Sequence, residues 1–141
     1  MNIMPDFTFL DNPTPGQLRQ ITALYHAEGW FSGKRAGDDL AAGIIAGSHC
    51  FVIATAGSEI IGMGRSISDG ISDAYVQDVT VKNVYRKLGI GSGIINALIA
   101  RLEADRLKWI GLVAERESYK FYERLGFKKM PNSTPMLKII L

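Results

Sequence analysis

Residues 79–93 read Val79-Thr80-Val81-Lys82-Asn83-Val84-Tyr85-Arg86-Lys87-Leu88-Gly89-Ile90-Gly91-Ser92-Gly93, and they constrain the architecture more tightly than any other stretch. An apolar β-type run passes into a basic, glycine-rich loop, and a long amphipathic helical pattern follows. Glycine lets backbone N–H groups approach a ligand closely, and a helix N-terminus adds free N–H donors and a positive dipole end. The junction therefore predicts an anion site suited to a phosphate or pyrophosphate.

Two common phosphate motifs do not fit this junction. The pattern GxxxxGK[ST] is absent, and the dinucleotide fingerprint would need a glycine at position 94, where the chain has Ile94. The pattern [Q/R]-x-x-G-x-[G/A] does fit, as Arg86-x-x-Gly89-x-Gly91. A glycine-rich turn of this kind could also serve only to reverse the chain.

Outside this junction, β-type and helical runs follow one another in a simple order. Strands are predicted over 7–10, 50–54, 60–67, 74–81 and 109–113, with two final strands over 127–130 and 136–141. Helices are predicted to begin near Pro15, Asp38, Gly89 and Ser118. Short turns between residues 50 and 81 imply an antiparallel meander, and the helix after it implies a parallel crossover. The order is β-α-α-β-β-β-α-β-α-β-β, an α/β chain with a mixed sheet.

Length and composition narrow the classes of function. The 141 residues fit one domain, 1–141, and 16 Lys+Arg against 14 Asp+Glu give a net charge of +2. Without a concentrated basic patch we expect no nucleic-acid partner, and without a long apolar run we expect no membrane span. The single cysteine and the widely separated His26 and His49 predict no metal site. The N-terminus lacks the features of a signal peptide, so a cytoplasmic location is expected.

A second motif lies downstream, where residues 121–127 read Phe-Tyr-Glu-Arg-Leu-Gly-Phe. The two motifs, in this order and separated by one apolar strand, resemble the GNAT superfamily of N-acetyltransferases. The resemblance implies the GNAT-like acyl-CoA N-acyltransferase fold and acetyl-CoA as cosubstrate. It also implies direct transfer of acetyl from the thioester to a neutral amine.

The same resemblance implies a cosubstrate site. The pantetheine arm would pair with backbone groups in the gap beside the strand before the loop, and the pyrophosphate would lie on the loop's N–H groups. The implied cosubstrate-binding residues are Val79, Val81, Arg86, Lys87, Leu88, Gly89, Ile90, Gly91, Ser92 and Ser118.

Two residues are implied in proton transfer. Tyr122 has the position of the family's usual thiol-protonating acid, and a phenol with a pKa of about 10 stays protonated at neutral pH. The common glutamate base is replaced by Tyr75, which leaves Asp78 on the same strand as base or substrate-positioning group. Tyr122 could instead be an aromatic core residue, and Asp78 a structural carboxylate with a water relay as base.

The stretch Tyr75–Val81 is similar to the serotonin-type arylalkylamine N-acetyltransferases, where an Asp occurs at the position of Asp78. Trp30, Phe31 and Tyr75 are the candidate substrate-binding residues, as an apolar wall for an aromatic or aliphatic amine. For Trp30 and Phe31, ordinary packing between two helices is the competing interpretation.

The leading function is therefore N-acetylation of a small primary amine. The alternatives are a protein or peptide N-acetyltransferase of the same fold and a non-catalytic CoA-binding sensor. The resemblance also implies a homodimer through the C-terminal strands. The apolar ending Met136–Leu141 is equally consistent with a buried final strand.

Overall fold

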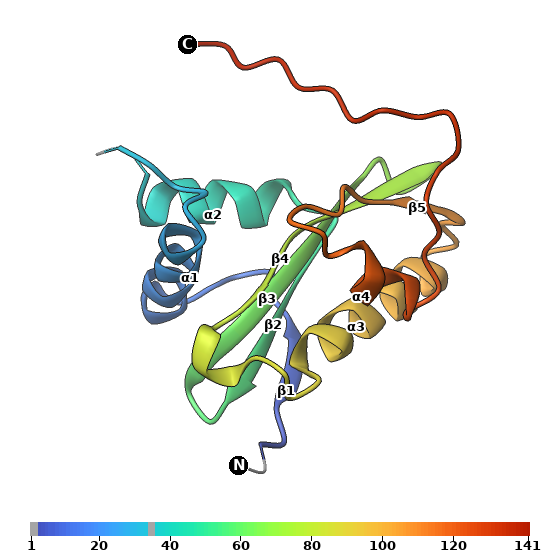
Figure 1. The fold of residues 1–141 in the computed structure, drawn as a ribbon. Coiled ribbons are helices and arrows are strands. Elements are labelled where there is room, and N and C mark those ends of the chain that lie inside the picture. The colour runs from blue at the N-terminus through green and yellow to red at the C-terminus, as the bar shows by residue number, and fades with distance from the viewer. Residues whose placement is uncertain (1–2, 34–35) are drawn as a thin grey trace.

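The computed structural model describes residues 3–33 and 36–141, which form one five-stranded sheet with helices on both faces (Figure 1). The strands lie in chain order: β1 (Asp6–Phe9), β2 (Cys50–Ala56), β3 (Glu59–Ser68), β4 (Asp73–Val81) and β5 (Trp109–Gly111). The helices are α1 (Pro15–Ala27), α2 (Asp38–Gly47), the 3-10 turn η1 (Asn83–Tyr85), α3 (Ile90–Ala104) and α4 (Tyr119–Glu123).

The strand pairing confirms the predicted meander and crossover. Strands β1 to β4 pair antiparallel, whereas β5 pairs parallel with β4 after the chain has passed through α3. A capping box forms at the predicted start of α1, because the Gln17 backbone N–H donates to the Thr14 hydroxyl at 3.1 Å and the Thr14 N–H donates to Gln17 at 2.9 Å. Local sequence therefore sets both the start of α1 and the path of the sheet.

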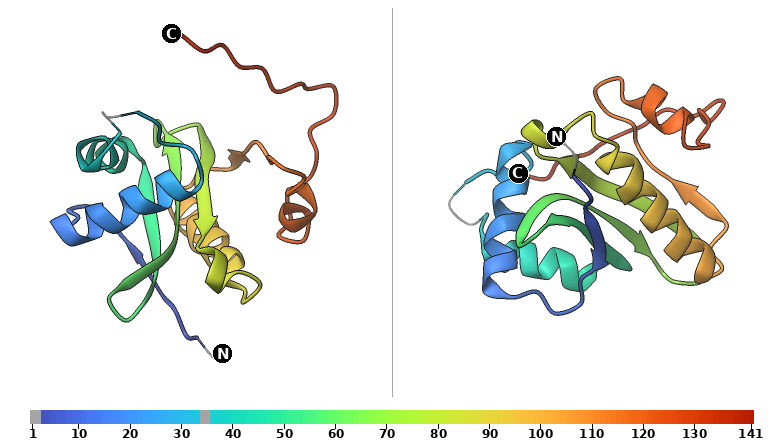
Figure 2. Two further views of the ribbon diagram at one scale, coloured as in Figure 1. Left: turned by 60° about the vertical axis from the view of Figure 1, so that its left-hand side comes forward. Right: turned by 90° about the horizontal axis from the view of Figure 1, so that it is seen from below.

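The sheet separates two hydrophobic cores. On one face, α1 and α2 bury Ile21, Leu24 and Tyr25 against side chains of β2 and β3. On the other face, α3 buries Ile94 and Leu98, among others, against β2, β3 and β4. The turned views in Figure 2 show the two helical layers on opposite sides of the sheet. Each fully buried Leu or Ile side chain contributes about 1.5–3 kcal/mol, so the α3 layer is firmly attached.

Two glycines in β3 let α3 approach the sheet closely. A Cβ on Gly62 would lie 2.9 Å from the Ile94 side chain, and one on Gly64 would lie 2.8 Å from it. Because real Cβ atoms are not found so close to a neighbour, a larger residue at either position would push α3 away. The glycines therefore fix the seat of the helix that begins at the Arg86–Gly91 motif.

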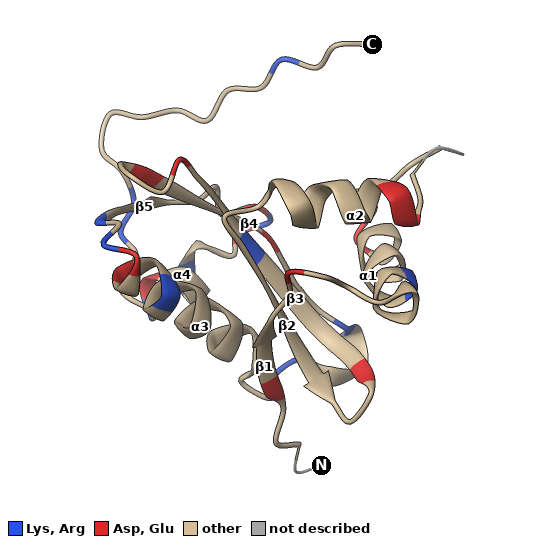
Figure 3. Cartoon of the chain, turned by 180° about the vertical axis from the view of Figure 1, so that it is seen from behind, with Lys and Arg blue, Asp and Glu red and all other residues tan. Residues whose placement is uncertain are grey.

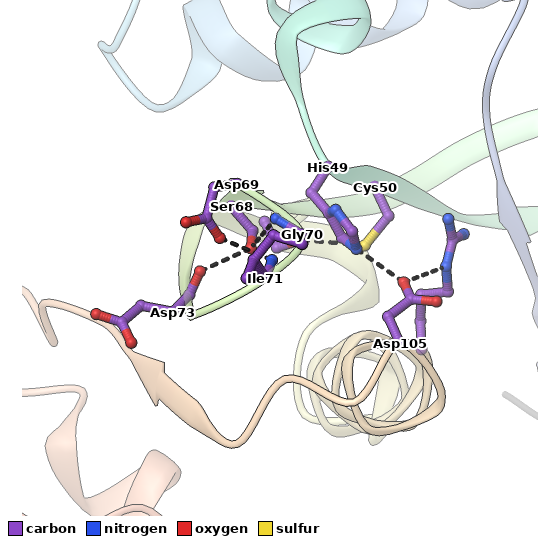
Figure 4. Close-up of polar contacts among 10 residues, drawn as sticks. His49, Cys50, Ser68, Asp69, Gly70, Ile71, Asp73 and Asp105 are labelled. Atoms are coloured by element: carbon purple, nitrogen blue, oxygen red, sulfur yellow. Dashed lines mark hydrogen bonds and ion pairs between the residues drawn. The ribbon is translucent and has the colours of Figure 1, made fainter.

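Polar contacts hold the end of the sheet where β2 starts and α3 stops (Figure 4). The His49 ring lies 2.7 Å from the Asp105 carboxylate, which also accepts a 2.9 Å hydrogen bond from Nε of Arg101. These partners lower the pKa of Asp105. In the β3–β4 turn, Asp69 accepts hydrogen bonds from the backbone N–H groups of Ile71 and Ser72. The His49–Asp105 contact therefore ties the start of β2 to the end of α3.

Figure 3 shows Lys and Arg interspersed with Asp and Glu along the chain. Within the described ranges, no helix has the length and hydropathy needed to cross a membrane. The same residues contain no group of three or more His, Cys, Asp or Glu that could hold a metal ion.

The two predicted strands at the C-terminal end do not form. Residues 127–130 and 136–141 pair with nothing, and after α4 the chain runs out from the body (Figure 1). A strand needs the edge of a neighbour, and β5, at that edge of the sheet, forms only three residues of pairing, all with β4. Met136 and Leu137 are 92% and 85% exposed, so the prediction from their apolar pattern lacks a burying partner here.

Candidate active site

The cleft of the molecule opens where β4 and β5 part. Their pairing ends at Tyr75 and Gly111, and β4 continues to Val81 with no β5 partner on that side. An open cleft of about 1230 Å³ lies beside this unpaired edge. Most of the predicted site residues line it: Trp30, Tyr75, Asp78, Val79, Val81, Arg86, Lys87, Gly89, Ile90, Gly91, Ser92, Ser118 and Tyr122.

The first turn of α3 faces this cleft. Gly89 is the N-cap with a left-handed φ of +81°, and no side chain of the described residues caps the turn. Gly91 lies against α4, since a Cβ there would be 3.3 Å from the Phe121 ring. An uncapped helix N-terminus with a glycine approach can hold an anion on its N–H groups. Leu88, in contrast, is 42% exposed and does not line the cleft.

Arg86 has other contacts than the sequence suggested. Its Nε donates a 2.9 Å hydrogen bond to the Val81 carbonyl oxygen, and its Nη2 donates one of 2.9 Å to Glu28. The guanidinium therefore ties the loop back to β4 and to the end of α1. It also bonds the Val81 carbonyl oxygen, one of the backbone groups that the family resemblance assigns to the pantetheine arm.

Asp78 lies at an irregularity in β4. The register with β3 shifts between Met63 and Arg65, and Asp78 has a left-handed φ of 57°. Bulges of this type redirect a side chain, and here Oδ2 of Asp78 accepts 2.6 Å from Nε of Arg65 and 2.8 Å from the Tyr25 hydroxyl. Burial and the Asp78 carboxylate together raise the pKa of Tyr25. Oδ1 of Asp78 makes no hydrogen bond within the described part of the chain.

Tyr122 packs among aromatic side chains and also borders the cleft. It lies on α4, and its ring packs edge-to-face on Phe121 and Phe127 at centroid distances of 5.0 and 5.7 Å. It also lines the cleft. Burial raises the pKa of its phenol, which keeps the proton in place at neutral pH. The residue is thus held rigidly with a proton available to donate.

The predicted aromatic wall is only partly present. Trp30 and Tyr75 line the cleft with 37% and 46% of their surface exposed. Phe31 is only 8% exposed and stacks on Tyr25 at 4.4 Å, so its predicted place in a substrate site is not what the structure shows. The N–H groups of Trp30 and Phe31 both donate to the Tyr25 carbonyl, and this tight turn places one ring outward and the other inward.

Several polar residues that line the cleft were not among the predicted site residues, including Glu28, Thr80 and Arg116. Glu28 precedes a glycine at the end of a helix, where an acidic residue reads as an ordinary surface charge. Nothing in the local pattern indicates that its side chain is only 12% exposed.

Strands β4 and β5 that diverge, a glycine-rich loop at a helix N-terminus and a partly buried tyrosine on the same cleft together point to an acyl-CoA-type transferase fold. The family model described as "Acetyltransferase (GNAT) domain" matches residues 22–137. The chain therefore belongs to the GNAT acetyltransferase family, and the expected fold class is confirmed.

Curated relatives match the chain over about half of its length. The uncharacterized N-acetyltransferase ycf52 of Pyropia yezoensis is 35% identical over 77 residues, which are 55% of this chain and 44% of that protein. The chloroplastic serotonin N-acetyltransferase 2 of Oryza sativa subsp. japonica is 33% identical over 73 residues, 52% of this chain and 36% of that protein. Histone acetyltransferase TAP1 of Glycine max is 36% identical over 72 residues, 51% of this chain and 31% of that protein. The chain thus spans less than half the length of these relatives.

Solved structures support the fold over almost the whole chain. A probable acetyltransferase from methicillin-resistant Staphylococcus aureus superposes with a TM-score of 0.78 at 23% identity. The superposition covers 98% of this chain and 100% of that one.

Proposed function

We propose that this chain is an acetyl-CoA-dependent N-acetyltransferase that transfers acetyl directly to a small primary amine. One observation carries the proposal: the Arg86–Gly91 loop and Tyr122 line the same cleft, beside the unpaired edge of β4. The two motifs lie about thirty residues apart in the chain, so only the fold brings them together.

The residues of the cleft fit acetyl-CoA. The unpaired edge of β4 near Val79 offers backbone groups to the amides of the pantetheine arm. The N–H groups of Ile90, Gly91 and Ser92 and the charge of Lys87 suit the pyrophosphate. When bound, acetyl-CoA would supply the thioester carbonyl that the amine attacks. This fit supports acetyl-CoA as the cosubstrate and requires no metal.

Two proton movements fall to this chain. Tyr122 donates its phenolic proton to the leaving sulfur, because burial raises its pKa and keeps it protonated. The proton of the attacking amine leaves through Oδ1 of Asp78 or through water, since Oδ2 is engaged by Arg65 and Tyr25. The paired state of Asp78 favours the water relay, with Asp78 in a positioning role.

The acceptor side supports an apolar amine. Trp30 and Tyr75 are partly exposed on the cleft wall, and Tyr75 packs edge-to-face on Trp109 at 5.3 Å. Similarity to the serotonin N-acetyltransferase of rice points the same way, and to the arylalkylamine branch. The soybean relative named as a histone acetyltransferase favours the second candidate, a protein or peptide acceptor.

A homodimer and a cytoplasmic location stay proposals. The exposed apolar segment Met136–Leu141 supports a dimer, since an isolated chain leaves it in water. Replacing Ile139 and Ile140 by lysine should then shift the mass measured by light scattering from dimer to monomer. A monomeric wild type would remove this part of the proposal. For the location, the rice relative is chloroplastic, which leaves the cytoplasm as an expectation from the sequence alone.

The test is thermal unfolding with and without acetyl-CoA, followed by thiol release with a panel of aromatic amines, aliphatic amines and N-terminal peptides. A ligand at 100 times its Kd stabilises the native state by about 2.7 kcal/mol, which raises the melting temperature visibly. Release of CoA with an arylalkylamine supports the enzyme proposed here, and release only with peptides supports the second candidate. A shift without turnover would favour the non-catalytic sensor, and no shift would refute the acetyl-CoA site.

A further inference from the structure

Glu28, just after α1, touches three elements around the cleft. One of its carboxylate oxygens, Oε1, accepts hydrogen bonds from the Thr80 hydroxyl and, at 2.9 Å, from Nη2 of Arg86. The other, Oε2, accepts one of 3.1 Å from Nη1 of Arg116, whose Nη2 also donates to the Glu28 carbonyl at 3.4 Å. The side chain is only 12% exposed, so both oxygens are satisfied by protein groups.

The contact with Arg116 spans the cleft. The chain leaves the sheet at Gly111, and Arg116 lies on the segment that leads from β5 into α4. Among the described residues, the bonds from Arg116 to Glu28 are the only side-chain hydrogen bonds between residues 112–141 and the rest of the chain. The other side-chain contacts that attach residues 112–141 among the described residues are apolar, such as the packing of Phe121 on the α3 core.

The contact with Arg86 fixes the opposite wall. Arg86 belongs to the loop before α3, and its second bond goes to the Val81 carbonyl on β4. One carboxylate therefore joins the Arg86 loop, β4 and the Arg116 segment. The backbone of Arg116 and Glu117 has φ values of 53° and 61°, which residues other than glycine rarely adopt unless their surroundings hold them there.

We propose that Glu28 is a positioning residue for the cosubstrate site, which holds the Arg86 loop and the Arg116 segment at the separation that acetyl-CoA requires. The inference rests on the proposed function. Arg86 and Arg116 are 51% and 68% exposed. Without the carboxylate, Arg86 would keep only its bond to the Val81 carbonyl, and Arg116 would keep only its 3.4 Å bond to the Glu28 carbonyl. Glu28 would thus act through the two arginines and not on the reacting atoms.

The test compares Glu28→Gln and Arg116→Gln with the control Glu103→Gln. Glu103 is an exposed residue of α3 that has no ion pair within the described residues. In the protein without ligand, both site variants should speed hydrogen–deuterium exchange of residues 112–118 about tenfold. Both should also weaken acetyl-CoA binding in calorimetry about tenfold and raise its KM, while kcat at saturation stays within about threefold of wild type. The control should match wild type in all three measurements.

A double variant separates a shared link from two independent effects. Because Glu28→Gln and Arg116→Gln remove the same connection, the pair should lose no more affinity than the more affected single variant. Additive losses would overturn the proposal. A kcat that falls with unchanged acetyl-CoA affinity, together with loss of the acidic limb of the pH–rate profile, would also overturn it, by making Glu28 a base.

Two outcomes keep this test independent of other failures. If Glu28→Gln does not fold, the surface variant Arg116→Gln still tests the proposal. Unchanged hydrogen–deuterium exchange of residues 112–118 in that variant refutes the positioning role of Glu28. If wild type binds no acetyl-CoA, the proposed function fails and this proposal with it. The exchange measurement then still reports whether the Glu28–Arg116 link holds the wall.

Discussion

The hydroxyl of Tyr25 donates a 2.8 Å hydrogen bond to Oδ2 of Asp78, which joins α1 to the irregular point of β4. Asp78 also pairs with Arg65 on β3, so three elements meet at one carboxylate oxygen. Tyr25 is almost fully buried, and its pKa is raised by that burial and by Asp78. The contact therefore links α1 to the strand that borders the cleft.

Removing this contact should cost stability. Tyr25→Phe leaves the ring in place but takes one donor from a charged acceptor, and we expect the free energy of unfolding to fall by about 1.5–3 kcal/mol. Urea denaturation followed by circular dichroism measures it. Tyr75→Phe is the matched control for stability, since Tyr75 is 46% exposed, and it should change by less than about 0.5 kcal/mol. An equal effect in both variants would contradict the role given to the Tyr25 hydroxyl.

Loss of the Tyr122 phenol should slow the chemical step. We expect Tyr122→Phe to lower kcat about 100-fold to 10,000-fold and to leave acetyl-CoA affinity nearly unchanged, since the ring packing is kept. Steady-state kinetics with thiol release measures this. Tyr119→Phe, on the same helix but outside the cleft, serves as control and should keep full activity. Wild-type activity of Tyr122→Phe would refute its role as the acid.

The seat of α3 can be tested with two alanines. Gly64→Ala places a Cβ 2.8 Å from Ile94 and 3.2 Å from Leu98, and this overpacking should destabilise the fold by about 1–3 kcal/mol. Gly43→Ala on α2 meets nothing within 4 Å and should stabilise it by about 0.5–1 kcal/mol, because alanine favours helix. Urea denaturation midpoints should therefore shift in opposite directions for the two variants. Shifts of the same sign would contradict either the overpacking expected at Gly64 or the helix propensity expected at Gly43.

Stability should fall in acid partly through Asp105. Its folded pKa lies below its ordinary value because of His49 and Arg101, so the unfolded chain binds protons more readily near pH 4. The contribution is present above the unfolded pKa of about 3.9 and is lost as the pH falls through the lower folded pKa. Asp105→Asn should therefore differ most from wild type in urea midpoints at neutral pH and least at pH 3. A constant difference across this range would contradict the linkage.

Local sequence patterns predicted most helices and strands, but the direction of individual side chains near the cleft depends on the tertiary fold. The Thr14–Gln17 capping box and the Arg86–Gly91 junction are short patterns whose physics is complete within a few residues. Phe31 and Glu28 are not, because whether a side chain near a helix end points inward depends on a turn that the pattern leaves open. The prediction of the two final strands was wrong for a related reason. An apolar run indicates that burial would be favourable, but it does not indicate which surface buries the run.

The two cores on opposite faces of the sheet have a consequence for how such a protein can diversify. Under the proposed function, the cosubstrate side depends on α3 and the core beneath it, and the acceptor side depends on α1, α2 and the turn after α1. The two cores lie on opposite faces of β2 and β3, so under the proposed function substitutions in residues 10–47 are expected to remodel which amine is accepted without redesigning the phosphate-binding end. Exchange of residues 10–47 between relatives is thus a practical route to new acceptor preference, with Tyr25 and Glu28 as the two positions that a graft must keep.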